Sequence, residues 1–578
     1  MLRIGRRIIL CLVIGLIATV VSAGKRAVPD PREAVRRAHE LHAAEAQRLS
    51  ARFTLSPANV QPKQKLDVLH ADLDLRIDPG QQTIRGSVTM QFSPTAALRK
   101  LKMRLREPLQ VNSTLMDGRP VQMNRSGSDL IFTFSPSLAP QSVHVLNVAY
   151  GGTPAPGGGI GGGMMFDTHQ NVPSATTLSE PFGSYNWWPC VDDLSDKLTV
   201  DVKLTVPPGM FGASNGKLAA ATPNADGWTT FHWIESYPLS NYLVSANVTN
   251  YAVFSSTYTS LDGKRKMPIR YYVYPEDLQQ AQQNFRNVPE MIRAFARLVG
   301  EYPFLKEKYG MVSFPFGGGM EHQTLTSVFD RAAGAAGDFD LLFAHELAHQ
   351  WFGDEVTCET WNDIWLNEGF ATYFEILWGL KAFGANEGDY MSIFYDDGLY
   401  NGQLRGSVHL NRSANPFMDT GAIYDKGGWV LHMLKYVMGE ERFFRALRNY
   451  RAAHAYSNAS TADLQAACEA VYGKSLEWFF DQWVFTPYRP IYGYSFTQSG
   501  NSVAVTITQS QPHRIANRTS GADTYIMPVR LTLHYSDGTS QVVTVWNDRR
   551  SQTFTLSALK TVASVGFDEE HRILMVLQ

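Results

Sequence analysis

The spacing of apolar residues changes twice along this chain of 578 residues. Between Leu66 and Val253 apolar and polar residues alternate, as in LDVLHADLDLRID, and Gly, Pro, Asn and Ser separate the alternating runs. A period of two predicts β-strands. From about Pro275 apolar residues recur at helical spacing, and after about Pro490 the alternation returns. We therefore expect a β domain, a mostly helical domain and a second, smaller β domain.

The length agrees with several domains, because 578 residues exceed what one hydrophobic core usually contains. We place an all-β domain at residues 61–256, the helical domain at 257–487 and the small β domain at 488–578. The segment PREAVRRAHELHAAEAQRLSARF predicts a helical extension within residues 24–60. The expected fold class is multidomain α+β.

The chain has nearly balanced charge, with 52 basic and 54 acidic residues. The body of the chain has no dense block of Lys and Arg, so nucleic acid is not an expected partner, and no oligomeric state is predicted. Cys11 belongs to the N-terminal segment. The other three cysteines, Cys190, Cys358 and Cys468, are odd in number and far apart, so no disulfide framework is implied.

The first 23 residues have the features of a secretory signal. Arg3, Arg6 and Arg7 precede an apolar run that ends at Val21, and Val21-Ser22-Ala23 matches a small-residue cleavage site. A retained membrane anchor is the alternative, but the run is short for a full span. We expect cleavage after Ala23, a periplasmic or secreted protein, and no stable membrane insertion of the mature chain.

Two histidines, His345 and His349, stand four residues apart in the apolar segment DLLFAHELAHQWFG. In a helix they lie on one face, one turn apart. Two imidazoles in this arrangement can bind one zinc ion. Glu346 points slightly around the helix, where it can reach a water molecule rather than the metal. HExxH alone is only suggestive, because it occurs by chance on many helices.

Glu368 is the candidate third ligand, 19 positions after His349 in the predicted helix NDIWLNEGFATYFE. Its aromatic neighbours indicate a partly buried carboxylate, which is costly unless it is paired with a cation. Two histidines and one carboxylate leave one coordination position for water, as in catalytic zinc sites. Glu375, two turns after Glu368, is either a partner of a ligating histidine or a solvated side chain.

Four motifs resemble the zinc aminopeptidases of the aminopeptidase N and leukotriene-hydrolase type. HELAH, followed after eighteen residues by the Glu of WLNEGFA, is similar to their HExxH-x18-E metal signature. FGGGMEHQT from Phe316 is similar to their Gly-x-Met-Glu-Asn element, and IYDKGGWVLHML from Ile423 to the segment with their catalytic tyrosine. NWWPCVDDLSDKLTVDVKLTVP from Asn186 resembles the PC-x-D signature of their N-terminal domain.

The resemblance implies an N-terminal β-sandwich or saddle domain, a mostly helical, thermolysin-like catalytic domain and a small C-terminal β-sandwich. The large C-terminal helical domain of many relatives is expected to be absent, which would leave the active-site cleft more open. One zinc ion per chain is implied, held by His345, His349 and Glu368. Glu346 would act as the general base, and Tyr424 would stabilise the oxyanion of the tetrahedral intermediate.

The resemblance also implies a site for the free α-amine of a peptide. Glu321 matches the amine-binding carboxylate, and Glu180 matches the usual place of a second one, although both could be ordinary surface carboxylates. Gly318, Gly319 and Met320 are expected to form a strand edge that holds extended substrate. His322 replaces the usual Asn, and because a His with a pKa near ~6.5 can carry charge, we expect it to affect amine binding or its pH dependence.

These observations predict an exported zinc aminopeptidase that acts on peptides with a free N-terminus. The alternatives are a zinc endopeptidase or an epoxide hydrolase on the same site, and a non-catalytic binding protein with a peptidase-like fold. Glu321 favours a free amine over an internal bond. The intact metal and catalytic residues argue against loss of activity.

Overall fold

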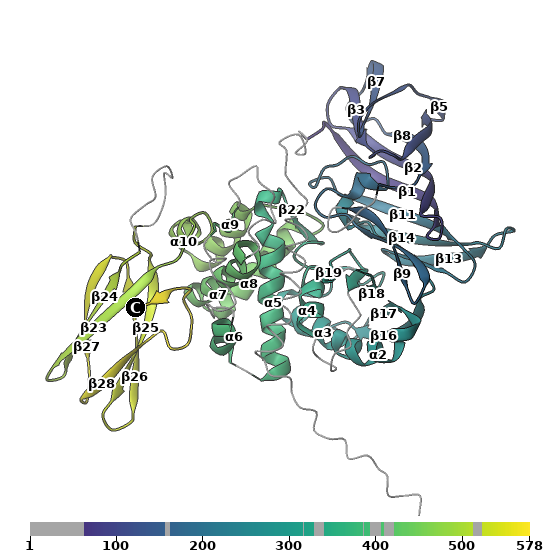
Figure 1. The fold of residues 1–578 in the computed structure, drawn as a ribbon. Coiled ribbons are helices and arrows are strands. Elements are labelled where there is room, and N and C mark those ends of the chain that lie inside the picture. Colours follow the sequence, from purple (N-terminus) through teal and green to yellow (C-terminus); the bar gives the residue numbers. More distant parts are fainter. Residues whose placement is uncertain are drawn as a thin grey trace, which may run out of the picture.

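The computed structural model describes residues 63–155, 162–315, 317–328, 340–384, 386–393, 406–409, 421–511 and 523–578. The predicted signal peptide and the helical extension at residues 1–60 lie outside the described residues. Figure 1 shows a β-rich N-terminal region, a helical central region and a C-terminal β region, with the helices between the two β regions. The predicted order of the three regions is confirmed.

The N-terminal β domain contains an eight-stranded sheet in the order β13-β14-β11-β1-β2-β8-β4-β5. The alternating sequence explains its central strand, because β1 buries Leu73, Leu75 and Ile77 and directs the residues between them to the other face. β1 pairs antiparallel with β2 and parallel with β11. The strands are β1 (Leu66–Asp78), β2 (Thr83–Pro94), β4 (Gln110–Met116), β5 (Arg119–Pro120), β8 (His144–Gly152), β11 (Leu198–Val206), β13 (Lys217–Pro223) and β14 (Thr229–Leu239).

Two smaller sheets belong to the same domain, in the orders β3-β7-β6 and β12-β15-β10-β9. In the second, β10 ends two residues before Glu180, and the short 3-10 turn η3 (Asn241–Leu243) leads into β15. Because β10 and β15 are antiparallel neighbours, Glu180 and η3 leave the sheet at the same end. The strands are β3 (Leu98–Arg104), β6 (Met123–Ser126), β7 (Asp129–Leu138), β9 (Gly163–His169), β10 (Val172–Leu178), β12 (Phe211–Ser214) and β15 (Ala246–Thr249).

The central region begins with a five-stranded sheet in the order β16-β17-β18-β20-β19. β16 pairs with β17 along its whole length, so the predicted domain boundary between residues 256 and 257 falls inside a strand. The predicted domain limits stay predictions. The strands are β16 (Ala252–Thr259), β17 (Lys266–Val273), β18 (Tyr309–Ser313), β19 (Gly319–Met320) and β20 (Thr326–Val328).

Helices make up the rest of the central region. The helix expected after Pro275 is divided, because Pro289 is tolerated in the first turn of α3 but not inside a longer helix. The α-helices are α2 (Leu278–Asn284), α3 (Val288–Val299), α4 (Asp340–Ala348), α5 (Trp365–Phe383), α6 (Glu387–Ile393), α7 (Gly427–Met438), α8 (Glu440–His454), α9 (Thr461–Tyr472) and α10 (Glu477–Trp483). Shorter elements are η2 (Ser184–Asn186), η4 (Pro275–Asp277), η5 (Phe285–Asn287), η6 (Trp361–Asp363), η9 (Gly421–Lys426), β21 (Val356–Cys358) and β22 (Ser457–Ala459).

The C-terminal β domain contains two sheets, in the orders β27-β24-β23-β29 and β26-β25-β28. It contacts α7, where the Leu574 amide donates to Met433 Sδ at 3.5 Å and a His432 ring nitrogen lies 3.1 Å from the His571 carbonyl oxygen. Among the described residues, no helix has the length and apolar character needed to cross a bilayer. The strands are β23 (Ile491–Ser499), β24 (Ser502–Gln509), β25 (Met527–Tyr535), β26 (Ser540–Asn547), β27 (Ser551–Ser557), β28 (Val562–Phe567) and β29 (Val576–Leu577).

Candidate active site

The two histidines of the HExxH motif lie at the C-terminal end of α4. The helix ends at Ala348, and the bond of 3.4 Å from the His349 amide to the His345 carbonyl continues its turn for one more residue. Both side chains are buried, and their ring centroids are 4.9 Å apart. The predicted arrangement of two imidazoles one turn apart is therefore present.

Glu368 joins them from the first turn of α5, which the chain reaches through β21 and η6. Its Oε2 lies 3.4 Å from Nε2 of His345 and 3.5 Å from Nε2 of His349. One nitrogen of each ring and one oxygen of Glu368 all lie within 4.8 Å of one another. The helix, short connection and returning helix thus bring the three candidate ligands together.

The second nitrogen of each ring has its own acceptor. Nδ1 of His345 lies 3.4 Å from Glu375 Oε2, and Nδ1 of His349 lies 3.1 Å from the carbonyl oxygen of Phe352. An acceptor at Nδ1 favours the tautomer with its proton there, which makes Nε2 the nitrogen available as a metal ligand. Glu375 is fully buried, so of the two readings the partner of a histidine is the one that the geometry favours.

The charges of this group are strongly coupled. Burial alone would raise the pKa of Glu368, but the imidazoles of His349 and His345 outweigh it and lower the pKa to about 2. Burial alone would lower the pKa of His345, but the carboxylates of Glu368 and Glu375 raise it well above its usual value. Glu368 therefore stays ionised, and a cation beside it, a proton or a metal ion, is favourable.

The donor set fits a zinc ion. Two imidazoles and one carboxylate are typical ligands of catalytic zinc, and both rings already have the outer partners that orient such ligands. Two other groups, Glu321–Glu346–His349 and Glu180–Glu321–Glu368, also have donor atoms within 4.8 Å. They contain one histidine and none, so they suit zinc less well than the set with two.

Glu346 lies against the backbone of β19. A Cβ atom added to Gly319 would be 2.2 Å from Glu346 Oε1 and 2.5 Å from its Cγ. Only a residue without a side chain leaves room for the carboxylate at this position. β19 is the edge strand of its sheet, and Gly318, with φ of 132°, immediately precedes it. The role of Gly318, Gly319 and Met320 in holding substrate stays a prediction.

Tyr424 lies in η9, a π-helical segment directly before α7. π-Helical segments are rare in proteins, and those that occur are often found at functional sites. The ring of Tyr424 is nearly parallel to that of His345, with centroids 5.8 Å apart and an angle of 13° between the planes. The structure thus brings Tyr424 beside the candidate metal ligands.

Two features hold η9 in place. The backbones of α5 and the start of α7 approach closely at Gly369 and Gly427. A Cβ atom on Gly369 would lie only 2.9 Å from Gly427 Cα, so there is no room for a side chain at this contact. The buried Lys426 Nζ donates to three backbone carbonyls, those of Gly406, Thr486 and Tyr488, at 2.9, 3.0 and 3.3 Å. Tyr424 therefore projects from a firmly anchored segment.

Glu180 and Glu321 lie beside the candidate metal ligands. Both are buried, and each has a carboxylate oxygen within 4.8 Å of the other and of Glu368. The Tyr242 hydroxyl donates to Glu321 Oε1 at 3.2 Å. Burial raises the pKa of Glu321, Glu368 adds to this rise, and His349 and Tyr242 oppose it. Such a cluster attracts a cationic ligand, because a positive charge relieves the repulsion between the carboxylates.

His322 lies in surroundings that disfavour a charge on its ring. The side chain is fully buried, and burial lowers its pKa to about 3. Nδ1 lies 2.9 Å from Ser327 Oγ, and Nε2 has no hydrogen-bond partner among the described residues. Burial therefore favours the neutral form of His322, and its effect on amine binding stays a prediction.

Sequence reasoning missed two residues that support this cluster. Tyr242 comes from η3 of the N-terminal β domain, and no motif around it indicates a role. Gln350 follows the second histidine of HExxH, and its Nε2 donates to the Glu321 carbonyl at 3.3 Å and to Asp354 Oδ2 at 2.6 Å. Its Oε1 accepts from the Thr324 amide at 3.0 Å. Gln350 thus ties α4 to the segment of Glu321.

The PC-x-D motif has a structural role. Cys190 and Arg104 exchange backbone hydrogen bonds of 2.8 and 3.2 Å, and Arg104 Nη1 donates to Asp192 Oδ2 at 2.8 Å. The motif thereby fastens its loop to β3. Cys190, Cys358 and Cys468 are all free and buried, as expected for cysteines without a disulfide framework.

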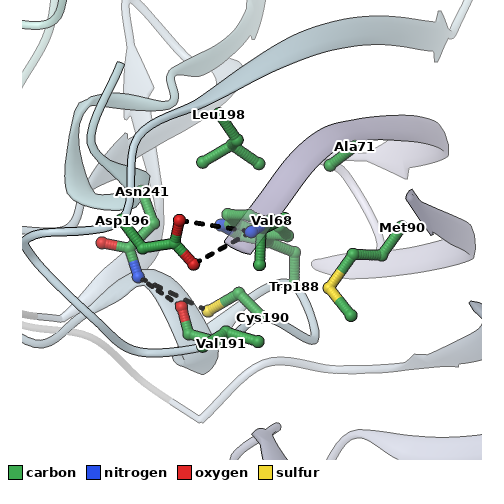
Figure 2. A pocket seen from close by; sticks show the side chains of 9 residues that line it. All are labelled: Val68, Ala71, Met90, Trp188, Cys190, Val191, Asp196, Leu198 and Asn241. Atoms are coloured by element: carbon green, nitrogen blue, oxygen red, sulfur yellow. Dashed lines mark hydrogen bonds between the residues drawn. The ribbon is translucent and has the colours of Figure 1, made fainter. Parts of the chain in front are cut away.

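A cavity of about 10 Å³ lies next to this motif (Figure 2). Asp196 accepts from the Val68 amide with both oxygens at 3.2 Å, and Asn241 Nδ2 donates to the Val191 carbonyl at 3.0 Å. A space of this size holds about one water molecule. The cavity is too small for a peptide, and most of its lining residues are apolar. The hydrogen bonds of Asp196 and Asn241 beside it connect the PC-x-D loop to β1 and η3.

Two family domains match the chain. Residues 286–483 match the Peptidase family M1 domain, and residues 67–243 match the Peptidase M1 N-terminal domain. Aminopeptidase M1-C of Oryza sativa subsp. japonica is 29% identical over 62% of this chain and 41% of its own length. Glutamyl aminopeptidase of Sus scrofa is 25% identical over 85% of this chain and 54% of its own length. The chain spans about half the length of these curated relatives, or less.

Solved structures agree with the sequence matches. A mutant of the M1 zinc metallopeptidase from Deinococcus radiodurans with a bound Tyr-Ser-Ala substrate has a TM-score of 0.64 and 26% identity, over 74% of this chain and 96% of that chain. A mutant of a two-domain M1 zinc metallopeptidase bound to L-tryptophan has a TM-score of 0.63 and 25% identity, over 71% and 93%. Both matched domains and these structures lead to one conclusion: the chain belongs to peptidase family M1.

Proposed function

We propose that the protein is a zinc-dependent aminopeptidase that removes N-terminal residues from peptides with a free α-amine. The observation that carries the proposal is that a buried His–His–Glu set shares Glu368 with an anionic cluster, in which Glu180, Glu321 and Glu368 lie within 4.8 Å of one another. A cationic terminal amine bound there would lie next to the metal, beside the bond to be cleaved. The relatives named aminopeptidases support this reading.

His345, His349 and Glu368 would hold one zinc ion. When bound, the ion would polarise the scissile carbonyl and lower the pKa of a water molecule towards ~7. Glu375 and the Phe352 carbonyl would orient the two imidazoles through their Nδ1 atoms.

Glu346 would accept the proton of the attacking water and pass it to the departing amine. A Glu346 oxygen lies within 4.8 Å of donor atoms of His349 and Glu321, so its carboxylate is close both to a proposed metal ligand and to the anionic cluster. This is the place where both proton transfers would occur.

Tyr424 would donate a hydrogen bond to the oxyanion that forms on the scissile carbonyl. The parallel contact with the His345 ring supports this role, because it brings the phenol to the side of a metal ligand. The anchored π-helical segment would limit the movement of the hydroxyl during the reaction.

Glu321, with Glu180, would bind the terminal ammonium by charge pairing. This contact would place the first peptide bond of the substrate at the metal, so that one residue is removed at a time. The backbone of Gly318, Gly319 and Met320 would pair with extended substrate at the edge of the sheet. His322, which is buried beside Ser327, would influence amine binding only through the position of its neighbour Glu321.

The test uses the purified full-length protein, its measured zinc content, and a panel of aminoacyl chromogenic substrates beside their N-acetyl forms. We expect turnover of the free-amine forms alone. Equal turnover of both forms would favour an endopeptidase. Turnover of neither by zinc-loaded protein would favour the epoxide hydrolase or binding-protein alternatives. Full activity without zinc would contradict the mechanism.

Two variants test the assigned roles. Glu346→Gln is expected to keep zinc and to lose about 10² to 10⁴ of kcat, the range for a general base. Glu321→Ala is expected to keep zinc and to reduce the preference for the free amine over its N-acetyl form. An active Glu346→Gln variant, or an unchanged preference in Glu321→Ala, would refute the respective assignment.

We also propose that the protein is exported to the periplasm or secreted after cleavage behind Ala23, on the basis of residues 1–23. The thermolysin-like character of the central region and the sandwich or saddle form of the β domains are part of the same proposal. N-terminal sequencing of the protein made in a secreting host is expected to begin at Gly24. A product that begins at Met1 and sediments with membranes would favour the anchor.

A further inference from the structure

Tyr242 reaches the anionic cluster from the N-terminal β domain. It lies in η3 and is fully buried. The preceding residue, Asn241, fixes this turn through its bond to the Val191 carbonyl, which Figure 2 shows. The ring of Tyr242 also has an edge contact with Trp361, with centroids 5.4 Å apart. The hydrogen bond of Asn241 and the ring contact with Trp361 together fix the position of the Tyr242 side chain.

The direction of the Tyr242 hydroxyl proton follows from its two partners. Asn367 Nδ2 lies 3.5 Å from the hydroxyl oxygen and donates to it, while Asn367 Oδ1 is bound by the Cys358 amide at 3.2 Å. The hydrogen bond from the Cys358 amide fixes the orientation of the Asn367 side chain, because the side-chain oxygen must face that donor. The hydroxyl therefore accepts from Asn367 and donates to Glu321 Oε1 at 3.2 Å.

This donor meets a specific need. Glu321 lies close to the carboxylates of Glu180, Glu346 and Glu368, and the repulsion among them favours rotation of its side chain away from the cluster. A neutral donor held from behind counters this rotation without neutralising the charge that would bind an ammonium group. We propose that Tyr242 is a positioning residue that holds the Glu321 carboxylate towards the terminal amine of the ligand.

The inference rests on the proposed function for the identity of the ligand, a free α-amine. It adds that the N-terminal β domain contributes a hydroxyl group to amine recognition as well as the carboxylate of Glu180. The effect is expected on amine binding, and the groups that would carry out bond cleavage are not expected to change.

The experiment compares zinc-loaded full-length wild type with Tyr242→Phe. The matched control is Tyr258→Phe. Tyr258 lies on β16 of the central sheet and is also fully buried, and its hydroxyl donates to Glu301 Oε1 at 2.7 Å. Each protein is titrated calorimetrically with a panel of free L-amino acids and their N-acetyl forms, and is assayed on an aminoacyl substrate. Zinc content and Tm are measured for each.

We expect Tyr242→Phe to weaken binding of the free amino acids and to raise KM by about tenfold, as for loss of a hydrogen bond to a charged group. The value of kcat is expected to change less than about threefold, because an interaction made equally in the ground and transition states affects binding alone. Zinc content and N-acetyl binding should not change, and Tyr258→Phe should bind like wild type. Unchanged amine binding, or an equal loss for N-acetyl forms, overturns the inference.

A double-mutant cycle separates positioning from general damage. In a Glu321→Ala background, Tyr242→Phe is expected to have no further effect, since the carboxylate that it holds is absent. Additive losses contradict the inference. If Tyr242→Phe does not fold, incorporation of 3-fluorotyrosine at position 242 provides a stronger donor of nearly the same shape, and unchanged or weaker amine binding would then overturn it.

The outcomes for the two proposals are distinct. A wild type that binds free amino acids in a Tyr242-dependent way but turns over no substrate contradicts the proposed function and leaves the inference intact. An active enzyme whose amine binding ignores Tyr242→Phe contradicts the inference alone. A wild type that binds none of the panel contradicts the inference.

Discussion

The carboxylate of Glu346 occupies the space that a side chain at Gly319 would need. A Cβ atom at Gly319 would lie 2.2 Å from Glu346 Oε1 and 2.3 Å from its carboxyl carbon. Real Cβ atoms do not approach other atoms so closely, so even alanine must displace the proposed general base. The two residues come from different elements, β19 and α4, so their contact couples the edge strand of the sheet to the proposed general base.

Gly319→Ala should therefore lower activity without removing zinc. Displacement of a reacting group by about 1 Å costs on the order of 10² in rate, and we expect kcat/KM to fall at least that far. Gly80→Ala is the control, because its Cβ would meet only Asp78 Oδ1 at 3.4 Å. Steady-state kinetics and zinc analysis check the result, and near-normal activity in Gly319→Ala would refute the role of the contact.

Tyr424→Phe should lose transition-state stabilisation. Removal of one oxyanion donor costs about 10² to 10³ in kcat, and KM should stay within about threefold, because the bond forms mainly in the transition state. The ring contact with His345 is retained in this variant, so zinc content should be normal. If kcat is unchanged while KM rises, Tyr424 contributes to binding rather than to the chemical step.

Glu375→Ala should weaken zinc binding. The carboxylate lies 3.4 Å from Nδ1 of His345, and loss of such an outer partner typically raises the metal Kd about 10- to 100-fold. Glu375→Gln keeps an acceptor oxygen of similar shape, so we expect an intermediate Kd. Competition with a chelator measures both values, with Glu346→Gln as the control that keeps the wild-type affinity. An unaltered Kd in Glu375→Ala would show that His345 needs no such partner.

His322 should make the native state less stable as the pH falls. Its folded pKa is about 3, below the ordinary 6.5, because burial disfavours the charged ring. The unfolded chain therefore takes up a proton near pH 6.5 that the folded protein refuses, and the stability present above that pH is lost gradually down to pH 3. At about 1.4 kcal/mol per pH unit, this residue would remove about 2 kcal/mol between pH 6.5 and pH 5.

Thermal unfolding across this pH range checks the effect in zinc-saturated protein. The Tm of wild type should fall more steeply towards pH 5 than the Tm of His322→Asn, which has no ring to protonate. His534→Asn is the control, because that ring is on the exposed side of the C-terminal β domain and is 41% accessible. Parallel Tm curves for wild type and His322→Asn would mean that burial does not shift this pKa.

Local spacing made most of the metal site predictable. His345 and His349 face the same side because one helical turn separates them, and this relation holds wherever the helix lies. Glu368 was predictable because the connection between the two helices is short, so the start of the second helix lies near the histidines at the end of the first. The order of β and helical regions was predictable for the same reason, since a period of two or of 3.6 is visible within a few residues.

The sequence by itself thus determined which residues could bind a metal and which segments form strands and helices. The tertiary structure alone decided that Tyr242 donates to Glu321 from 79 residues away, that Gly319 makes room for Glu346, and that His322 is buried. The physical reason is range: periodicity is a property of neighbouring residues, whereas burial and contacts between distant segments exist only once the domains have packed.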